Sequence, residues 1–315
     1  MPTISQIQYI LAVDRYRHFG NAAKACHIAQ PSLSMQIQKV EEELGFLIFD
    51  RNKKPVLATK KGERFIAQAK HVIREHEKLI KMSREDSDSI SGDFRLGIIP
   101  TIMPYLLPKF IGLFSERFPG VTLRVDELKT QDIISELRKD TLDAGILATP
   151  LQEKGIRERP LFYEPFFLYA HEGHHLLGQE KVSPEGFSSE DIWLLEDGHC
   201  FKNQVSNFCS LEEKAGVYSN IIFEGGNLET LRYLVKESKG YTLVPYLFAE
   251  NLPQEEKTSM VRPFCEPIPS REVSIVFSRD QWKTDIVGAL QEVIQEALPS
   301  GLNNERTAQQ KVIPV

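Results

Sequence analysis

Residues 4 to 58 combine apolar spacing with helix-start and helix-stop residues in an order that few folds satisfy. Apolar side chains recur at helical spacing over Ile4 to Leu11, over Ala22 to Cys26, and again from residue 33 to residue 44. The third run begins just after Pro31, which suits a first helical position because its missing N–H would be unpaired there, and it stops at Gly45. The pattern predicts two short amphipathic helices followed by a longer third helix.

Two short apolar runs bracket a basic turn after the third predicted helix. Leu47 to Phe49 and Val56 to Ala58 flank the stretch Asp50 to Pro55, which predicts a strand, a turn and a strand. Polar side chains on a helix in the major groove contact base edges and phosphates, and a basic wing beside it reaches the backbone or the minor groove. The candidate DNA-binding residues are Pro31, Ser32, Ser34, Gln36, Lys39, Arg51 and Lys53.

The charge distribution supports a polyanionic partner for this part of the chain. Residues 1 to 84 carry 15 Lys and Arg against 8 Asp and Glu, a balance of +7, although the whole chain has a net charge of -6. The remainder is therefore strongly acidic. The alternative is a three-helix bundle with an ordinary solvated polar face, and the basic excess argues against it.

Residues 61 to 90 predict a linker helix with an apolar stripe. Ile66, Ala69, Ile73 and Ile80 are spaced by three, four and seven residues. Because the stripe is long for a lone surface helix, we expect it to pair with its copy in a second subunit, as a reader of two DNA half-sites requires. We assign residues 1 to 60 to a winged helix-turn-helix DNA-binding domain and residues 61 to 90 to a dimerisation helix.

The rest of the chain has the pattern of an α/β domain. After a polar linker at Ser87 to Asp93, strand-like and helix-like segments alternate, which predicts a mostly parallel sheet. We expect a two-lobed regulatory domain over residues 91 to 298 and a mobile tail over residues 299 to 315. Lobe I is expected at about 91 to 165 and 270 to 298, and lobe II at about 166 to 269.

The first part of the chain resembles the LysR-type transcriptional regulators. The resemblance covers the segment from Phe19 to Ser34, the run Glu41 to Gly45, and Phe49 to Arg51. It implies a DNA-binding homo-oligomer, a dimer of dimers, that contacts RNA polymerase. It also implies that the two α/β lobes form an effector domain built like a periplasmic binding protein.

Two cysteines nine positions apart, Cys200 and Cys209, suggest redox chemistry. A thiol with a second thiol in reach is oxidised to a sulfenic acid and then resolved to a disulfide, reversibly. If the intervening segment is helical, the two α-carbons lie roughly 14 Å apart, whereas a disulfide requires about 7 Å or less. Bridging would then refold the segment. The alternative is two buried, inert thiols, and we expect Cys26 and Cys265 to be packed in that way.

The stretch from Leu195 to Cys200, together with Cys209, resembles the hydrogen-peroxide-sensing OxyR branch of that family. This resemblance implies that Cys200 is the peroxide-reactive thiol and Cys209 its resolving partner, reset by a thiol reductant. It further implies that Thr101, Thr130 and Arg271 line the peroxide pocket, and His199 stands beside the reactive cysteine. The sequence departs from the branch at Lys202 and Asn203, where an arginine and an acidic residue are common.

Parts of the sequence are also compatible with other functions. The run His171 to His175 fits the zinc-protease pattern H-E-x-x-H, but it follows a predicted strand and has glycine at its centre, which favours a polar loop. A LysR-type sensor of a small metabolite and a thiol peroxidase remain alternatives. We expect no cofactor and no metal, and a regulator instead of an enzyme. No stretch has the roughly 20 apolar residues of a membrane helix, so we expect a cytoplasmic protein without a membrane partner.

Overall fold

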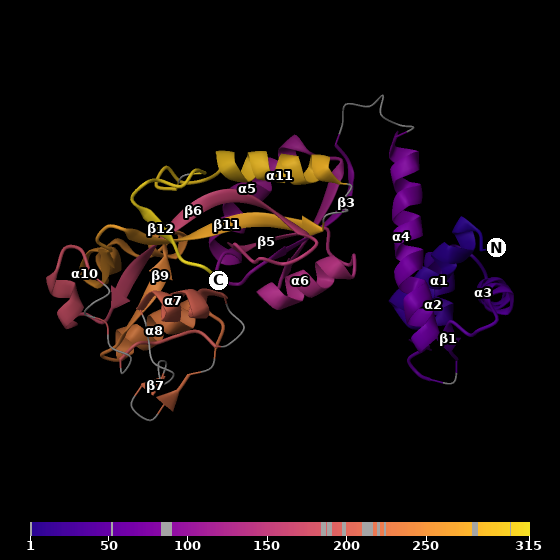
Figure 1. Ribbon diagram of the computed structural model, residues 1–315, viewed down its shortest axis with the longest axis horizontal. Coiled ribbons are helices and arrows are strands. Elements are labelled where there is room, and N and C mark those ends of the chain that lie inside the picture. The colour runs from indigo at the N-terminus through magenta and orange to yellow at the C-terminus, as the bar shows by residue number, and fades with distance from the viewer. Residues whose placement is uncertain are drawn as a thin grey trace. The chain divides into compact units, whose positions relative to one another are not determined.

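The chain folds into two compact units, Met1–Asp88 and Ser89–Val315, which are described separately (Figure 1). The computed structural model describes residues 2–51, 53–82, 90–183, 187, 191–196, 200–209, 217–218, 221–223, 225–278, 283–302 and 304–315. No helix in these ranges combines the length and the apolar character that a membrane crossing requires.

The first unit is a three-helix bundle with a wing and a long helix. Thr3 begins the first helix with a capping box, and Gly45 ends the third with a φ of 71°, a conformation that suits glycine. Ile10, Val13 and Leu33 are among the buried side chains that join the helices in one apolar core. The elements are α1 (Ile4–Tyr16), α2 (Phe19–Ala25), α3 (Gln30–Leu44), β1 (Phe49–Asp50), β2 (Leu57–Ala58) and α4 (Lys60–Met82).

Strands β1 and β2 pair antiparallel, with Phe49 opposite Ala58. They form the predicted wing, and α1 to α3 form the predicted helix-turn-helix bundle.

The second unit contains a mixed sheet flanked by helices. Helices α5 and α11 lie over one face of the sheet and α6 over the other (Figure 1). Its elements are β3 (Gly92–Ile98), α5 (Met103–Arg117), β4 (Val121–Glu127), α6 (Thr130–Arg138), β5 (Ala144–Thr149), β6 (Ile156–Ala170), the 3-10 helix η1 (His175–Gly178), α7 (Cys200–Cys209), β7 (Val217–Tyr218), β8 (Ile221–Ile222), α8 (Leu228–Glu237), β9 (Tyr241–Pro245), α9 (Tyr246–Glu250), α10 (Gln254–Met260), β10 (Val261–Pro263), β11 (Ile268–Ser278), α11 (Thr284–Glu296) and β12 (Gln310–Val312).

The expectation of a mostly parallel sheet was wrong. The strand order is β10-β6-β11-β5-β3-β4, with β9 beside β6 and β12 beside β11. Strand β3 pairs parallel with β4 and β5, but β11 runs antiparallel to both β5 and β6. The chain returns into the middle of the sheet through β11, and this long-range insertion reverses the strand direction there.

The expectation of a mobile tail at residues 299 to 315 was also wrong. Residues Gln310–Val312 form β12, which pairs parallel with the start of β11, placing Gln310 opposite Ile268 and Val312 opposite Ser270. Ile313 follows with only 3% of its surface exposed. The tail is ordered because β11 offers it a free edge and the core accepts its apolar side chains.

Candidate functional site

A buried arginine, Arg271, lies at the centre of the second unit's polar site. It stands on β11 with none of its side chain exposed. Its Nη1 donates to Thr101 Oγ1 at 2.9 Å, its Nη2 donates to the Thr101 carbonyl at 3.2 Å, and its Nε donates to Glu164 Oε2 at 2.8 Å. The guanidinium is therefore held in one orientation by β6 and by the turn that follows β3. The structure thus brings together the predicted site residues Thr101 and Arg271.

Glu164 is the counter-ion of Arg271, and the sequence analysis missed it. It lies on β6 directly opposite Arg271 in the strand pairing, fully buried, with Oε2 at 2.7 Å from Nη2. Its Oε1 accepts a hydrogen bond from the Leu247 backbone N–H at 2.7 Å. The available clue was a lone carboxylate within the largely apolar stretch Leu161 to Ala170, because a charge in a buried strand requires a partner.

Helix α7 begins against this site. The Phe201 ring, 2% exposed, lies with its centroid 5.6 Å from Arg271 Cζ, and it packs edge to face on Phe166 at 5.3 Å between centroids. Cys200 is the first residue of the helix and Cys209 the last. Cys200 therefore directly precedes Phe201, whose ring contacts the buried Arg271 guanidinium.

The α7 backbone keeps its two cysteines apart. Nine steps of about 1.5 Å place the α-carbons of Cys200 and Cys209 roughly 13.5 Å from each other, about twice the separation that a disulfide tolerates. This helix therefore represents a state without a Cys200 to Cys209 bridge.

The other two cysteines differ in exposure. Cys26 is half-buried and burial raises the pKa of its thiol, which makes it less reactive. Cys265 is exposed, so the expectation that it is packed was wrong. It lies just beyond β10, where the chain leaves the sheet.

Thr130 contributes a second buried hydroxyl. It is the first residue of α6, it is 5% exposed, and its Oγ1 has no hydrogen-bond partner within the described part of the chain. Helix α6 lies close to the sheet at Gly145, where an added Cβ would come within 2.4 Å of Ile133 Cγ2. The described contacts do not join Thr130 to Thr101 or Arg271. His199, the fourth predicted pocket residue, lies outside the described residues.

The residue before Thr130 connects to the segment before Cys200. Lys129 Nζ lies 2.5 Å from Glu196 Oε1, and the Glu196 backbone N–H donates to the Gly225 carbonyl at 3.1 Å. This ion pair joins the start of α6 to residues 191–196.

In the first unit, the predicted DNA-binding residues fall into two groups. Pro31, Ser32, Lys39 and Lys53 are exposed and are therefore accessible to a ligand. Gln36 and Ser34 are half-buried and make internal contacts: Gln36 Oε1 accepts from Gln6 Nε2 at 2.9 Å, and Ser34 Oγ accepts from Arg51 Nη1 at 3.0 Å.

Arg51 joins the wing to α3, a role that the sequence analysis did not predict. Its Nη2 lies 2.9 Å from Glu41 Oε2, while Glu41 Oε1 accepts from the backbone N–H groups of Ile48 and Phe49 at 2.8 and 3.1 Å. The guanidinium also lies over the Phe19 ring at 5.2 Å. Since 37% of its side chain remains exposed, Arg51 is fixed beside the polar face of α3 and still accessible.

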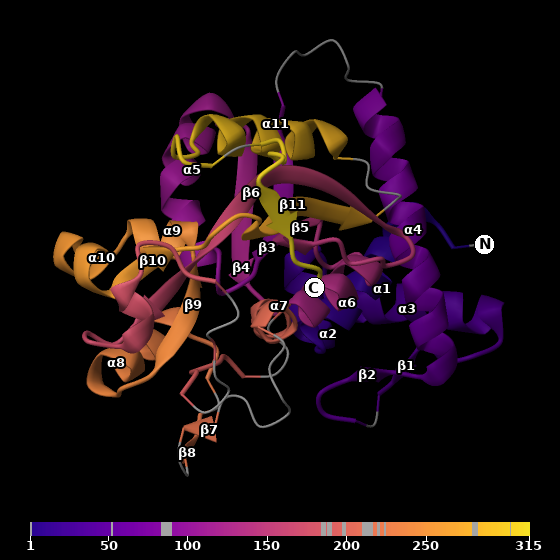
Figure 2. The same cartoon turned by 60° about the vertical axis from the view of Figure 1, so that its left-hand side comes forward.

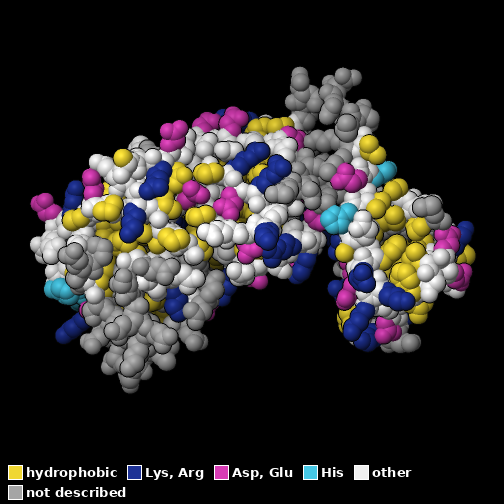
Figure 3. Space-filling model, in the orientation of Figure 1, with side chains coloured by type: hydrophobic (Ala, Val, Ile, Leu, Met, Phe, Trp, Pro, Cys, Tyr) yellow, Lys and Arg dark blue, Asp and Glu magenta, His cyan; other side chains and the backbone are white. Residues whose placement is uncertain are grey.

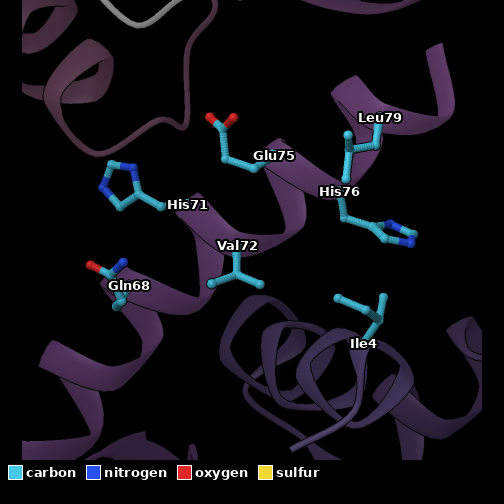
Figure 4. A pocket seen from close by; sticks show the side chains of 7 residues that line it. All are labelled: Ile4, Gln68, His71, Val72, Glu75, His76 and Leu79. Carbon is cyan, nitrogen blue, oxygen red and sulfur yellow. The ribbon is translucent and has the colours of Figure 1, made fainter. Parts of the chain in front are cut away.

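Exposed apolar surface is concentrated in the first unit. Val72 and Leu79 on α4, together with Ile4 of α1, line a groove of about 360 Å³ that His71 and His76 also border (Figure 4). The hydrophobic side chains of this unit appear in yellow in Figure 3. Among the described residues, the exposed large hydrophobic side chains are Tyr16, Met35, Leu47, Val72, Leu79, Ile80 and, in the second unit, Tyr233.

The histidine-rich motif lies in a turn and not on an α-helix. His171 Nδ1 lies 2.9 Å from the Lys236 carbonyl, and His174 Nε2 lies 3.2 Å from Asp191 Oδ2. The two histidines that the pattern requires are His171 and His175, and they do not share a face of an α-helix, because residues 171–174 form a turn and His175 begins η1. No metal-binding group of three His, Cys, Asp or Glu residues occurs in the described ranges. The segment is a turn followed by η1, as the loop interpretation predicted.

Comparison with known proteins matches both units to one family. Residues 4–63 match the family model "Bacterial regulatory helix-turn-helix protein, lysR family", and residues 87–299 match "LysR substrate binding domain". The chain is 36% identical over 276 residues to the hydrogen peroxide-inducible genes activator of Dickeya chrysanthemi, covering 87% of this chain and 88% of that protein. It is 35% identical over 275 residues to the DNA-binding transcriptional dual regulator OxyR of Escherichia coli K12, with the same coverage.

Solved structures agree with these matches. A cysteine-to-aspartate variant of full-length OxyR from Pseudomonas aeruginosa superimposes with a TM-score of 0.78 at 30% identity, covering 94% of this chain and 98% of that one. A hydrogen peroxide-bound OxyR mutant from Corynebacterium glutamicum has a TM-score of 0.60 at 25% identity, covering 94% and 92%. This protein therefore belongs to the LysR family of helix-turn-helix transcriptional regulators, in the branch of the hydrogen peroxide-inducible genes activators.

Proposed function

We propose that this protein activates peroxide-defence genes and is switched by a reversible disulfide between Cys200 and Cys209. The observation that carries the proposal is the position of α7. This helix has one cysteine at each end and begins against the buried Arg271, whose guanidinium is bonded to Thr101. A reactive thiol at the start of α7 would therefore act beside a fixed cation and a hydroxyl.

In the first step, the Cys200 thiolate attacks one oxygen of hydrogen peroxide. The O–O bond breaks, an S–O bond forms, and the leaving hydroxide takes up a proton, giving Cys200 sulfenic acid and water. The Thr101 hydroxyl can donate a hydrogen bond to the departing oxygen, because its own oxygen already accepts from Arg271 and its hydrogen is free, while the proton that the hydroxide takes up comes from solvent. The positive guanidinium stabilises negative charge that develops on the departing oxygen.

Thr130 would hold the peroxide in place. Its buried Oγ1 is without a partner among the described residues, and such a hydroxyl is costly unless a ligand or water satisfies it. We assign Thr130 and His199 to the same pocket. The Lys129 to Glu196 ion pair, next to Thr130 in the sequence, connects the start of α6 with residues 191–196.

In the second step, the Cys209 thiol attacks the sulfenic sulfur and releases water, so that both thiols are oxidised and one peroxide is reduced to two waters. The two α-carbons must approach from roughly 13.5 Å to within about 7 Å. Helix α7 must therefore lose helical structure between its ends, which changes the surface next to it. A thiol reductant returns the two electrons and restores the helix.

The first unit would transmit this change to DNA. We propose that Pro31, Ser32, Ser34, Gln36 and Lys39 on α3 face the major groove of double-stranded DNA, with Arg51 and Lys53 at the wing. The exposed apolar side chains of α4 would pair with a second copy of the chain, and two dimers would form a tetramer.

We propose residues 1 to 60 as the DNA-binding domain, 61 to 90 as the dimerisation helix and 91 to 298 as the two-lobed regulatory domain. The protein would act in the cytoplasm, with RNA polymerase as its transcription partner, as a stoichiometric sensor and not as an enzyme.

Stoichiometric oxidation tests the proposal. Reduced protein is treated with near-equimolar hydrogen peroxide, free thiols are alkylated, and disulfides are mapped by mass spectrometry. We expect one Cys200 to Cys209 bridge in the wild type, a trapped sulfenic acid in Cys209→Ser and no peroxide consumption in Cys200→Ser. Wild type that stays reduced favours a metabolite sensor and refutes the switch. Repeated peroxide turnover with excess dithiol would instead indicate a thiol peroxidase.

A further inference from the structure

The C-terminal segment lies against α7. Figures 1 and 2 show the C-terminus beside this helix from two directions. Strand β12 pairs with β11, and the Ile313 backbone N–H donates to the Ser270 carbonyl at 2.9 Å. Ser270 immediately precedes Arg271 on the same strand. One short segment thus connects the strand of the buried cation with the surroundings of α7.

Gln204 links α7 to that segment. It is the fifth of ten residues in the helix, its side chain is fully buried, and its Nε2 donates to the Ile313 carbonyl at 2.8 Å. Its Oε1 has no hydrogen-bond partner among the described residues. An amide buried with half of its hydrogen-bonding capacity unused is uncommon in a core, where an apolar side chain would be less costly. The Gln204 amide is therefore better explained by its hydrogen bond to the Ile313 carbonyl than by packing alone.

The segment that Gln204 holds is itself anchored. Arg306 Nε and Nη2 each donate to the Gln310 carbonyl at 3.2 Å, and Gln310 Oε1 accepts from the Thr307 backbone N–H at 3.1 Å. The Ile268 backbone N–H donates to the Gln309 carbonyl at 2.8 Å. These contacts make the Ile313 carbonyl a fixed acceptor for the helix.

We propose that residues 310 to 315 form a C-terminal clasp that keeps α7 helical, and that Gln204 and Ile313 are positioning residues which set the redox potential of the switch. The inference rests on the proposed Cys200 to Cys209 disulfide. Because bridging must unwind the middle of α7, it must break the Gln204 to Ile313 hydrogen bond. The clasp stabilises only the reduced state, so removing it favours oxidation.

A matched pair of helix substitutions tests the clasp. Gln204→Met keeps the side-chain length and removes the amide, and Asn203→Met also replaces an amide by methionine, with a longer side chain, at the neighbouring exposed position. Full-length proteins are equilibrated in buffers of reduced and oxidised dithiol, and the bridged fraction is measured by alkylation and mass spectrometry. We expect Gln204→Met to raise the equilibrium constant for oxidation about tenfold, a potential about 30 mV more negative. Asn203→Met should not favour oxidation, because methionine has a higher helix propensity than asparagine and leaves the Gln204 to Ile313 hydrogen bond in place.

A pair of truncations tests the same contact from the other side. Ending the chain after Val312 removes the Ile313 carbonyl, whereas ending it after Pro314 keeps it. Only the first truncation should shift the potential. Adding Gln204→Met to it should shift the potential no further, because the truncation, which also removes the Ile313 N–H bond to Ser270, has already broken the Gln204 to Ile313 hydrogen bond. Equal shifts within either matched pair, or no shift in both test variants, would overturn the clasp. A wild type that never bridges would instead overturn the underlying switch.

Discussion

Replacing one member of the buried Arg271 to Glu164 pair should destabilise the second unit more than replacing both. Neither side chain has any exposed surface, so Glu164→Leu leaves an uncompensated guanidinium and Arg271→Met an uncompensated carboxylate. Each single change is expected to cost about 3–5 kcal/mol. The double variant removes both charges and leaves mainly the Leu247 N–H and the Thr101 hydroxyl without their partners. We expect it to lose about 1–3 kcal/mol of unfolding free energy.

Urea unfolding followed by tryptophan fluorescence measures these costs in the full chain. Both tryptophans, Trp193 and Trp282, belong to the second unit, so the fluorescence does not report on the first. The double-variant cycle should give a coupling free energy above about 2 kcal/mol. If the two single losses simply add in the double variant, the pair is not energetically coupled and the reasoning fails. A changed slope against urea concentration would show that the variants no longer unfold like the wild type.

Three further measurements test other parts of the structure. Thr130→Val removes a buried hydroxyl without a described partner, so the reduced protein should unfold at the same or a higher urea concentration. Peroxide should oxidise Cys200 in this variant at least about tenfold more slowly than in the wild type. An unchanged oxidation rate would contradict the assignment of Thr130 to the peroxide pocket. Lys39→Ala should weaken binding to all DNA sequences alike and reduce the slope of log affinity against log salt by about 1; a sequence-dependent loss would instead indicate base contact. Hydrogen bonds from Arg232 lower the pKa of Glu256 from 4.5 to about 2, so its carboxylate stabilises the fold above pH 4.5 and this contribution is lost as pH falls toward 2. Glu256→Gln should therefore be less stable at pH 7 and lose less stability on acidification, and equal acid losses in both proteins would refute this.

The helix-turn-helix unit was predictable because its determinants are local. Pro31 and Gly45 mark the ends of α3 in the sequence, and the apolar spacing between them gives the buried face directly. The wing follows from two apolar runs on either side of a basic turn. These features require no knowledge of distant parts of the chain.

The polar site was only partly predictable. Thr101 and Arg271 were found through a family resemblance, and Glu164 was not found at all. It meets Arg271 because β6 and β11 pair in one particular register across 107 residues of chain. No local pattern encodes that register. The same holds for β12, a three-residue strand that is ordered only because β11 receives it.

Strand β6 has a consequence for how the second unit unfolds. Its residues from Ile156 to Pro165 pair with β11, with a register shift at Leu161, and those from Phe166 to Ala170 pair with β9, so one strand takes part in both pairings. Neither the β6–β11 pairing nor the β6–β9 pairing can open completely without breaking hydrogen bonds of a strand that the other pairing also contains. The amide protons of β6 that are hydrogen-bonded to β11 and to β9 should accordingly exchange with solvent at similar, slow rates, because the opening of either pairing disturbs the other.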